Sequence, residues 1–197
     1  MTSLFDLYKI GVGPSSSHTM GPMRAACRFA QELDRNGLLD RAARIQTDLY
    51  GSLALTGMGH ATDRAILLGL QGNEPAKIDP AAIASAVAAI RASRRIDVAG
   101  KRAISFDETR DLLFHRDQMF PPGASTKHPN GMRFTAFDAD GAISAQHTFF
   151  SIGGGFIAEM EKPISHRASR RCGCRFHSTA RQSCLRSPAR TRSPSTA

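Results

Sequence analysis

Apolar residues recur at helical spacing in three segments of the chain. Intervals of three and four positions predict helices over 22–35, from 62 or 63 to 70, and over 80–91. Asn36-Gly37 ends the first segment, and Asp79 precedes the third as an N-cap that is followed by a first-turn proline. The chain is therefore expected to carry several amphipathic helices.

Strand patterns occupy other segments. Residues 44–50 alternate apolar and polar side chains, which predicts a strand with one wetter face. Two further strands are predicted over 132–137 and 142–150, joined by the turn Asp-Ala-Asp-Gly at 138–141. Residues 109–129 are predicted to be mostly loop. Because helices and strands mix without a regular βαβ alternation, the expected fold class is α+β, with a mixed or antiparallel sheet covered by helices.

The charge of the chain is concentrated near its end. The 197 residues carry 26 Lys plus Arg against 17 Asp plus Glu, a formal net charge of +9. All the acidic residues lie within 1–161, which is neutral, whereas 162–197 holds the whole surplus as Lys162 and arginines. We therefore predict a folded domain over 1–161 and a disordered Arg/Ser/Pro-rich tail over 162–197.

This tail has three interpretations. It is a natural basic tail, or it results from a shifted reading frame, because an acid-free mixture of Arg, Ser, Pro, Ala and Cys is typical of a GC-rich gene read out of frame. We favour the shifted frame, and an intact frame near the codon of Glu159 would exclude it. A nucleic-acid binder is the weakest interpretation, since Phe176 is the one aromatic residue in the tail that is suited to stacking.

Other classes of protein and site are disfavoured as well. The N-terminus lacks the basic region of a signal peptide, and the longest apolar run, 81–90, is far below the roughly 20 residues that span a bilayer. We expect a cytoplasmic protein that binds neither membrane nor nucleic acid. Cys27 stands alone in the body, and the three cysteines of the tail fit no standard zinc spacing, so we predict no metal ligand.

The most unusual segment is Gly-Val-Gly-Pro-Ser-Ser-Ser-His-Thr-Met-Gly-Pro at 11–22. Hydroxyls and free backbone N–H groups just before a helix form an anion site, suited to a carboxylate or a phosphate. His18 would add a proton or a hydrogen bond there. A capped helix after a serine-rich turn is the plain alternative. The predicted binding residues are Ser15, Ser16, Ser17 and Thr19.

A second Gly/Ser/Thr loop, at 51–63, lies between a predicted strand and a predicted helix. Loops in that position carry sites, because their backbone can approach a ligand from a rigid base. His60 is the catalytic candidate here, and Thr62 and Asp63 are binding candidates. The alternative is that Thr62 or Asp63 only caps the helix.

Two more segments complete the candidate set. His128 and Asn130 stand at a turn that enters a strand, although Asn-Gly is a turn signal in any protein. The three consecutive glycines at 153–155 cost conformational entropy, which suggests close backbone approach to a ligand and makes Gly153 and Gly154 binding candidates. A β-bulge is the plain alternative.

In their order along the chain, these segments resemble the bacterial iron–sulfur L-serine dehydratases of the single-chain type. The resemblance covers 1–161 and corresponds to the family's N-terminal beta domain, whose fold resembles an allosteric substrate-binding domain. Family members continue into a larger helical domain with the cysteines that hold a 4Fe-4S cluster, and no cysteine of this chain matches those ligands in context. The matching blocks are 3–23, 50–53, 59–63, 128–132 and 151–156.

The resemblance implies deamination of L-serine to pyruvate and ammonia. The serines and Thr19 would hold the substrate carboxylate, and the proton-handling or orienting groups would be His18, His60, His128 and Asn130. Which histidine acts as the base stays open.

The implied partner is a C-terminal alpha domain, and the full-length protein is expected to be a homo-oligomer. We expect this chain to be truncated and inactive alone. The alternatives are a beta subunit that works with a separate alpha chain, and a serine-binding module without chemistry.

Overall fold

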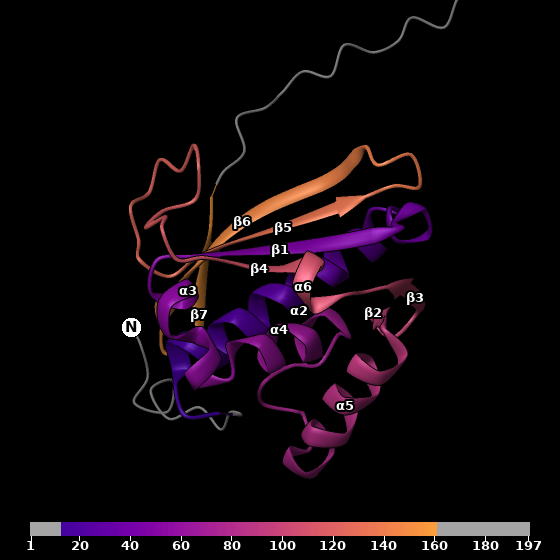
Figure 1. Cartoon of the computed structure of the whole chain (residues 1–197), viewed down its shortest axis with the longest axis horizontal. Coiled ribbons are helices and arrows are strands. Elements are labelled where there is room, and N and C mark those ends of the chain that lie inside the picture. Colours follow the sequence, from indigo (N-terminus) through magenta and orange to yellow (C-terminus); the bar gives the residue numbers. More distant parts are fainter. Residues whose placement is uncertain (1–12, 161–197) are drawn as a thin grey trace, which may run out of the picture. The chain divides into compact units, whose positions relative to one another are not determined.

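The fold was obtained as a computed structural model that describes residues 13–160 (Figure 1). The predicted basic tail over 162–197, its reading-frame interpretation and the first two residues of the 11–22 segment lie outside this range. Within 13–160, every helix is too short or too polar to cross a bilayer.

A five-stranded sheet, in the order β4-β1-β5-β6-β7, forms one layer of the described residues. The β1 and β4 strands run parallel, and every other neighbouring pair is antiparallel. This mixed sheet confirms the α+β fold class. The strands are β1 (Arg44–Tyr50), β4 (Leu112–His115), β5 (Gly131–Phe137), β6 (Ile143–Gly153) and β7 (Phe156–Glu159).

Two helices, α2 (Gly21–Arg35) and α4 (Thr62–Leu70), pack against each other and form a second layer on one face of the sheet (Figure 1). A Cβ atom at Gly69 would lie 2.3 Å from the carbonyl oxygen of Met23, so glycine is what allows this close approach. The α2 helix also contacts β6, and the ring of Phe29 stacks on that of Phe134 with centroids 5.4 Å apart.

Smaller elements connect these two layers. A two-stranded antiparallel ribbon of β2 and β3 follows α5, and short helical turns occupy the connections. The remaining elements are η1 (Ser16–Met20), η2 (Leu39–Arg41), α3 (Ser52–Thr56), η3 (Gly57–His60), η4 (Pro80–Ala82), α5 (Ile83–Ser93), β2 (Arg95–Val98), β3 (Arg102–Ser105) and α6 (Glu108–Asp111).

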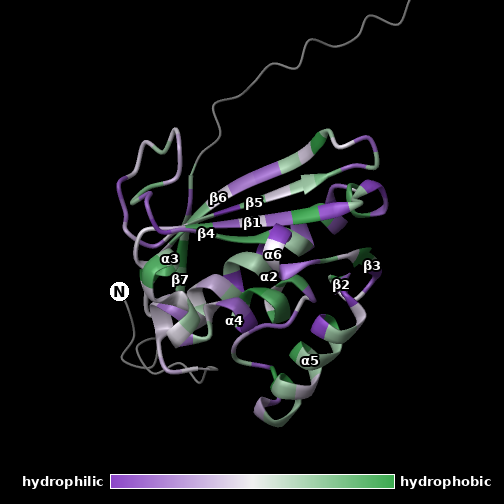
Figure 2. Cartoon of the chain, in the orientation of Figure 1, coloured by the Kyte–Doolittle hydropathy of each residue, from purple (hydrophilic) through white to green (hydrophobic). Residues whose placement is uncertain are grey.

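The sheet is amphipathic. Ile45, Leu49, Phe134 and Phe149 are fully buried in the core that the helices cover. Figure 2 shows hydrophilic residues alternating with hydrophobic ones along the strands, which is the pattern of a sheet with one polar face. The expected strand over 44–50 is confirmed, but its last residues are buried on both faces because the ring of Tyr50 stacks on that of His115.

Of three local predictions, one is confirmed, one is wrong and one is incomplete. The helix predicted over 22–35 is confirmed as α2 (Gly21–Arg35), and the π-helical turn η1 runs directly into it. The predicted 51–63 loop is mostly helical, as α3 and η3. Residues 109–129 are mostly loop, as predicted, but they also contain the end of α6 and the whole of β4. The β4 strand has no local alternation and exists through its parallel pairing with β1, which no short-range pattern encodes.

Candidate active site

The 13–20 segment folds as a capped helix start. The Ser15 hydroxyl accepts a hydrogen bond from the backbone N–H of His18 at 3.3 Å, and the Ser15 carbonyl accepts one from the N–H of Thr19 at 2.9 Å. Gly13 has φ +101°, and a Cβ there would lie 2.3 Å from the Thr19 methyl group, so only glycine fits. The plain capping interpretation is therefore correct for Ser15, and it leaves the neighbouring hydroxyls to other partners.

Those hydroxyls form a hydrogen-bonded chain through His18. Ser15 Oγ lies 3.3 Å from Ser17 Oγ, and Ser17 Oγ lies 2.9 Å from His18 Nδ1. On the other side of the ring, His18 Nε2 lies 3.0 Å from Ser52 Oγ at the start of α3. Both ring nitrogens of His18 are thus engaged by hydroxyl groups, which fixes the orientation of the imidazole.

His60 is the second imidazole of the cluster, with its ring centroid 4.9 Å from that of His18. His60 Nδ1 lies 2.9 Å from the carbonyl oxygen of Thr56. Because a carbonyl only accepts, Nδ1 carries the proton and Nε2 of the neutral ring holds the free lone pair. The residue that follows, Ala61, has φ +57°, a left-handed conformation that costs free energy and is found preferentially at functional sites.

The electrostatics of the pair favour an uncharged His18. Burial, followed by the proximity of His60, lowers the pKa of His18 below its ordinary value of 6.5. His18 is therefore neutral at pH 7, so it can donate through one ring nitrogen and accept through the other.

Two buried threonines lock the histidine segments together. Thr19 Oγ1 donates to the carbonyl of His60 at 3.0 Å, and Thr62 Oγ1 donates to the carbonyl of His18 at 2.6 Å. Thr19 and Thr62 thus hold the two loops in register, although both were predicted to bind substrate.

Ser52 connects this cluster to the His128–Asn130 turn. While its hydroxyl contacts His18, its backbone N–H donates to the carbonyl of Pro129 at 2.7 Å. Gly51 has φ +56°, and a Cβ there would lie 2.3 Å from the same Pro129 oxygen, so the close contact requires glycine. Ser52 was not predicted as a site residue. The sequence did contain one indication of it, because Ser52 follows Gly51, which stands directly after the predicted strand.

The Asn130 side chain reaches the end of β6. Its Nδ2 donates to the Ser151 carbonyl at 3.2 Å, and its backbone N–H donates to His128 Nδ1 at 3.2 Å. Asn130 Oδ1 and Ser151 Oγ are buried without a hydrogen-bond partner among residues 13–160. Such atoms point to a polar group that joins the site in the working protein, because a buried unpaired acceptor is unfavourable.

The other predicted residues lie around this cluster or away from it. Gly153, Gly154 and the next glycine all have positive φ, which confirms the three-glycine bend. A Cβ at Gly155 would lie 3.3 Å from Met20 side-chain atoms, so the bend packs on the helix start. Ser16 is exposed. Asp63 forms an ion pair with Arg91 at 2.8 Å.

A family model matches most of the chain. Residues 3–162 match the family model described as "Serine dehydratase beta chain". The chain belongs to this family. The match spans every element from η1 to β7.

Curated relatives of the family carry consistent names. The chain is 45% identical over 159 residues to the "L-serine dehydratase" of Streptomyces coelicolor. This alignment covers 81% of this chain and 34% of the relative. It is 48% identical over 155 residues to the "L-serine dehydratase" of Mycobacterium tuberculosis, and this alignment covers 79% of this chain and 32% of the relative. It is 43% identical over 162 residues to "L-serine dehydratase 1" of Escherichia coli, where the alignment covers 82% of this chain and 34% of the relative. The chain therefore spans about a third of the length of these relatives.

Proposed function

We propose that this chain supplies the substrate-binding and proton-abstracting part of an L-serine dehydratase, which converts L-serine to pyruvate and ammonia. The observation that carries the proposal is the His18–His60 pair surrounded by serine hydroxyls, in a family whose relatives bear that name. The alternative is a serine-binding module that catalyses no reaction. Such a module would also need the hydroxyls, but it would not require a second imidazole with a free lone pair.

The hydroxyls at the helix start would bind the substrate carboxylate. Ser16 is exposed, and Ser17 and Ser15 lie one hydrogen bond apart at the N-terminal end of the continuous helical segment η1–α2. A carboxylate is favoured there by the N–H groups of the first turn and by the helix dipole. The bend at Gly153 and Gly154, of which Gly154 is exposed, would close over the same end, because its third glycine lies against Met20.

His60 is the better base of the two histidines in contact. Its Nδ1–H is held by the Thr56 carbonyl, so Nε2 is left to accept the Cα proton of serine. The ring nitrogens of His18 both contact hydroxyls, and its low pKa keeps it neutral, so His18 is better suited to orient Ser52 and Ser17. His128 and Asn130 would position the amino group or the hydroxyl of the substrate.

His60 Nε2 takes the Cα proton, and the Cβ–O bond breaks. The departing hydroxide takes up one proton and leaves as water, so return of the proton held by His60 balances the step and leaves aminoacrylate. Aminoacrylate tautomerises to an imine, and the imine hydrolyses to pyruvate and ammonia. The group that assists departure of the hydroxyl is not assigned to residues 13–160.

A 4Fe-4S cluster does not fit the described part of the chain. Cys27 is the one cysteine within 13–160, and burial, followed by the charge of Glu74, raises the pKa of its thiol. A cluster needs several thiolates. We therefore propose that any such cluster is held by the other two-thirds of the enzyme, as a C-terminal alpha domain or a separate alpha chain.

Exposed apolar side chains support such a partner. Leu55 and Met58 lie in α3 and η3 close to His60, and each leaves more than half of its surface in solvent, 55% and 57%. We propose that the partner covers them and that the complete enzyme is a cytoplasmic homo-oligomer.

Trans-complementation tests this function. The chain would be mixed anaerobically with the part of the Streptomyces coelicolor relative that it does not match, and pyruvate formation from L-serine would be measured. We expect turnover from the mixture, no turnover from the chain alone, and a loss of at least 100-fold in kcat for His60→Ala.

His115→Ala is the matched control, because His115 lies in the edge strand β4 and pairs with Asp48. We expect this variant to retain turnover. Full activity with His60→Ala would refute the catalytic assignment, and serine binding without turnover by any mixture would favour the binding module.

A further inference from the structure

Three side chains of ligand type meet where α2 faces β6 and β7. His147 Nδ1 lies 2.5 Å from Glu159 Oε1 and 3.2 Å from Glu32 Oε2. One ligand atom of each residue lies within 4.8 Å of the others, and all three residues are half-buried. None of them belongs to the proposed active site.

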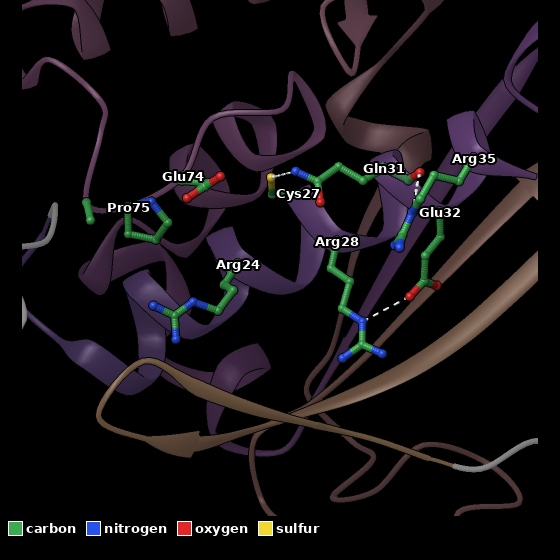
Figure 3. Close-up of a pocket in the computed structure, with 9 residues that line it drawn as sticks. Arg24, Cys27, Arg28, Gln31, Glu32, Arg35, Glu74 and Pro75 are labelled. Atoms are coloured by element: carbon green, nitrogen blue, oxygen red, sulfur yellow. Dashed lines mark hydrogen bonds and ion pairs between the residues drawn. The ribbon is translucent and has the colours of Figure 1, made fainter. Parts of the chain in front are cut away.

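Arg28 orients both carboxylates of this group. Its Nε donates to Glu32 Oε1 at 2.9 Å, and its Nη2 donates to Glu159 Oε2 at 2.7 Å. The other oxygen of each carboxylate is thereby turned toward His147. Figure 3 shows Arg28 extending from α2 with its guanidinium group bonded to Glu32. This is the arrangement of an outer-sphere residue that holds first-sphere ligands in place.

The proton on His147 Nδ1 cannot serve both the Glu32 and the Glu159 carboxylates. A neutral His147 has one proton to give at Nδ1, and the short contact directs it to Glu159. Glu32 Oε2 is then left buried and without a hydrogen-bond partner among the described residues. A cation would satisfy all three ligand atoms at once, because the ring proton can reside on Nε2 and leave the Nδ1 lone pair free.

We propose that Glu32 Oε2, His147 Nδ1 and Glu159 Oε1 form a binding site for a divalent first-row transition-metal ion, with Zn²⁺ as the reference. One imidazole and two carboxylates are a common donor set for such ions. Ligand atoms of a tetrahedral zinc ion lie about 3.3 Å apart, and the Glu32–His147 spacing already matches this value. The shorter His147–Glu159 contact would open by less than 1 Å, a change of roughly the size that side-chain torsions allow.

Two cavities reach this site. One, of about 120 Å³, is lined by Glu32 and His147 among other residues. The other, of about 450 Å³, runs along α2, and Arg28 and Glu32 form part of its wall (Figure 3). A bound ion would join α2 to β6 and to the edge strand β7 through one atom. We therefore expect metal binding to stabilise the β7 edge of the sheet.

Calorimetric titration of the 197-residue chain with Zn²⁺ at pH 7.5 tests this proposal. The three tail cysteines would first be changed to serine in every sample (Cys172→Ser, Cys174→Ser and Cys184→Ser), so that thiolates do not compete for zinc. We expect one equivalent of Zn²⁺ to bind, with a rise in the melting temperature, and Co²⁺ to give visible d–d absorption bands. His147→Gln and Glu159→Gln should each weaken zinc binding at least tenfold.

His115→Gln is the matched control, since His115 contacts a single carboxylate, that of Asp48, and should leave binding unchanged. A circular-dichroism spectrum and melting curve without metal would show that each variant is folded. The proposal is overturned if no stoichiometric zinc binds, if His147→Gln binds as tightly as the parent chain, or if binding is lost in His60→Gln instead. Equal affinity for Mg²⁺ would also contradict it, because Mg²⁺ prefers all-oxygen sites.

Discussion

The backbone carbonyls of His18 and His60 are each held by the threonine that lies next to the other histidine. Thr62 donates to His18, and Thr19 donates to His60. This reciprocal pair of hydrogen bonds, and not a direct bond between the rings, keeps the two imidazoles 4.9 Å apart.

We predict that Thr62→Val lowers the free energy of unfolding by about 1–3 kcal/mol, because it leaves the His18 carbonyl buried without its donor. Urea denaturation measures this change. Thr56→Val is the matched control, since the Thr56 hydroxyl donates to a carbonyl at an exposed position and its loss should cost less than about 0.5 kcal/mol. Equal effects of the two variants would show that the Thr62 hydrogen bond is not a locking contact.

The stability of the chain should fall at mildly acidic pH through His18. The pKa of His18 is lowered in the folded state, so the unfolded chain takes up a proton first as the pH falls through 6.5. The contribution of neutral His18 to the free energy of unfolding is therefore complete above pH 6.5 and declines below it. It stops declining once His18 is protonated in the folded protein as well. Urea denaturation of the parent chain and of His18→Gln between pH 5 and 8 checks this prediction. As the pH falls, the free energy of unfolding of the parent chain should decrease relative to that of His18→Gln.

Gly21 should not tolerate a side chain. A Cβ there would lie 2.0 Å from Ser151 Oγ, so we predict that Gly21→Ala costs about 1–3 kcal/mol despite the higher helix propensity of alanine. Gly59→Ala serves as the control, because no atom lies within 4 Å of the added Cβ and φ is not positive there. Thermal melts of both variants compare the two positions, and similar melting temperatures would contradict the predicted clash.

Asp111 should contribute more to stability than its partner Arg110. The Asp111 side chain is fully buried and accepts a hydrogen bond at 2.9 Å from the backbone N–H of Asp107, the N-cap residue of the short helix α6. We expect Asp111→Ala to cost about 1–3 kcal/mol and Arg110→Ala, whose side chain is half exposed, to cost less than about 1 kcal/mol. Urea denaturation would again decide, and the reverse order would refute this assignment.

Sequence patterns predicted the elements whose folding depends on near neighbours. The α4 helix begins at Thr62, within the predicted limits, and the turn of the hairpin closes as expected, with Asp138 Oδ1 accepting from the N–H of Ala142. The β4 strand was missed, because its pairing with β1 joins residues far apart in the chain. The α2 helix begins at Gly21, one residue before the predicted start, whereas the π-helical turn η1 that precedes it, capped by Ser15, was not predicted.

The sequence by itself determined the α+β class, the family resemblance and the set of polar residues from which a site could be built. Only the tertiary structure decided which of these polar residues meet at the candidate site and which pair elsewhere. It joined His18 to His60 and Ser52, and it directed Asp63 to Arg91. It also assembled Glu32, His147 and Glu159 from a helix and two strands. The physical reason is that periodicity and turn chemistry act between neighbours in the chain, whereas hydrogen-bond partners across loops are chosen by the packing of the helices on the sheet.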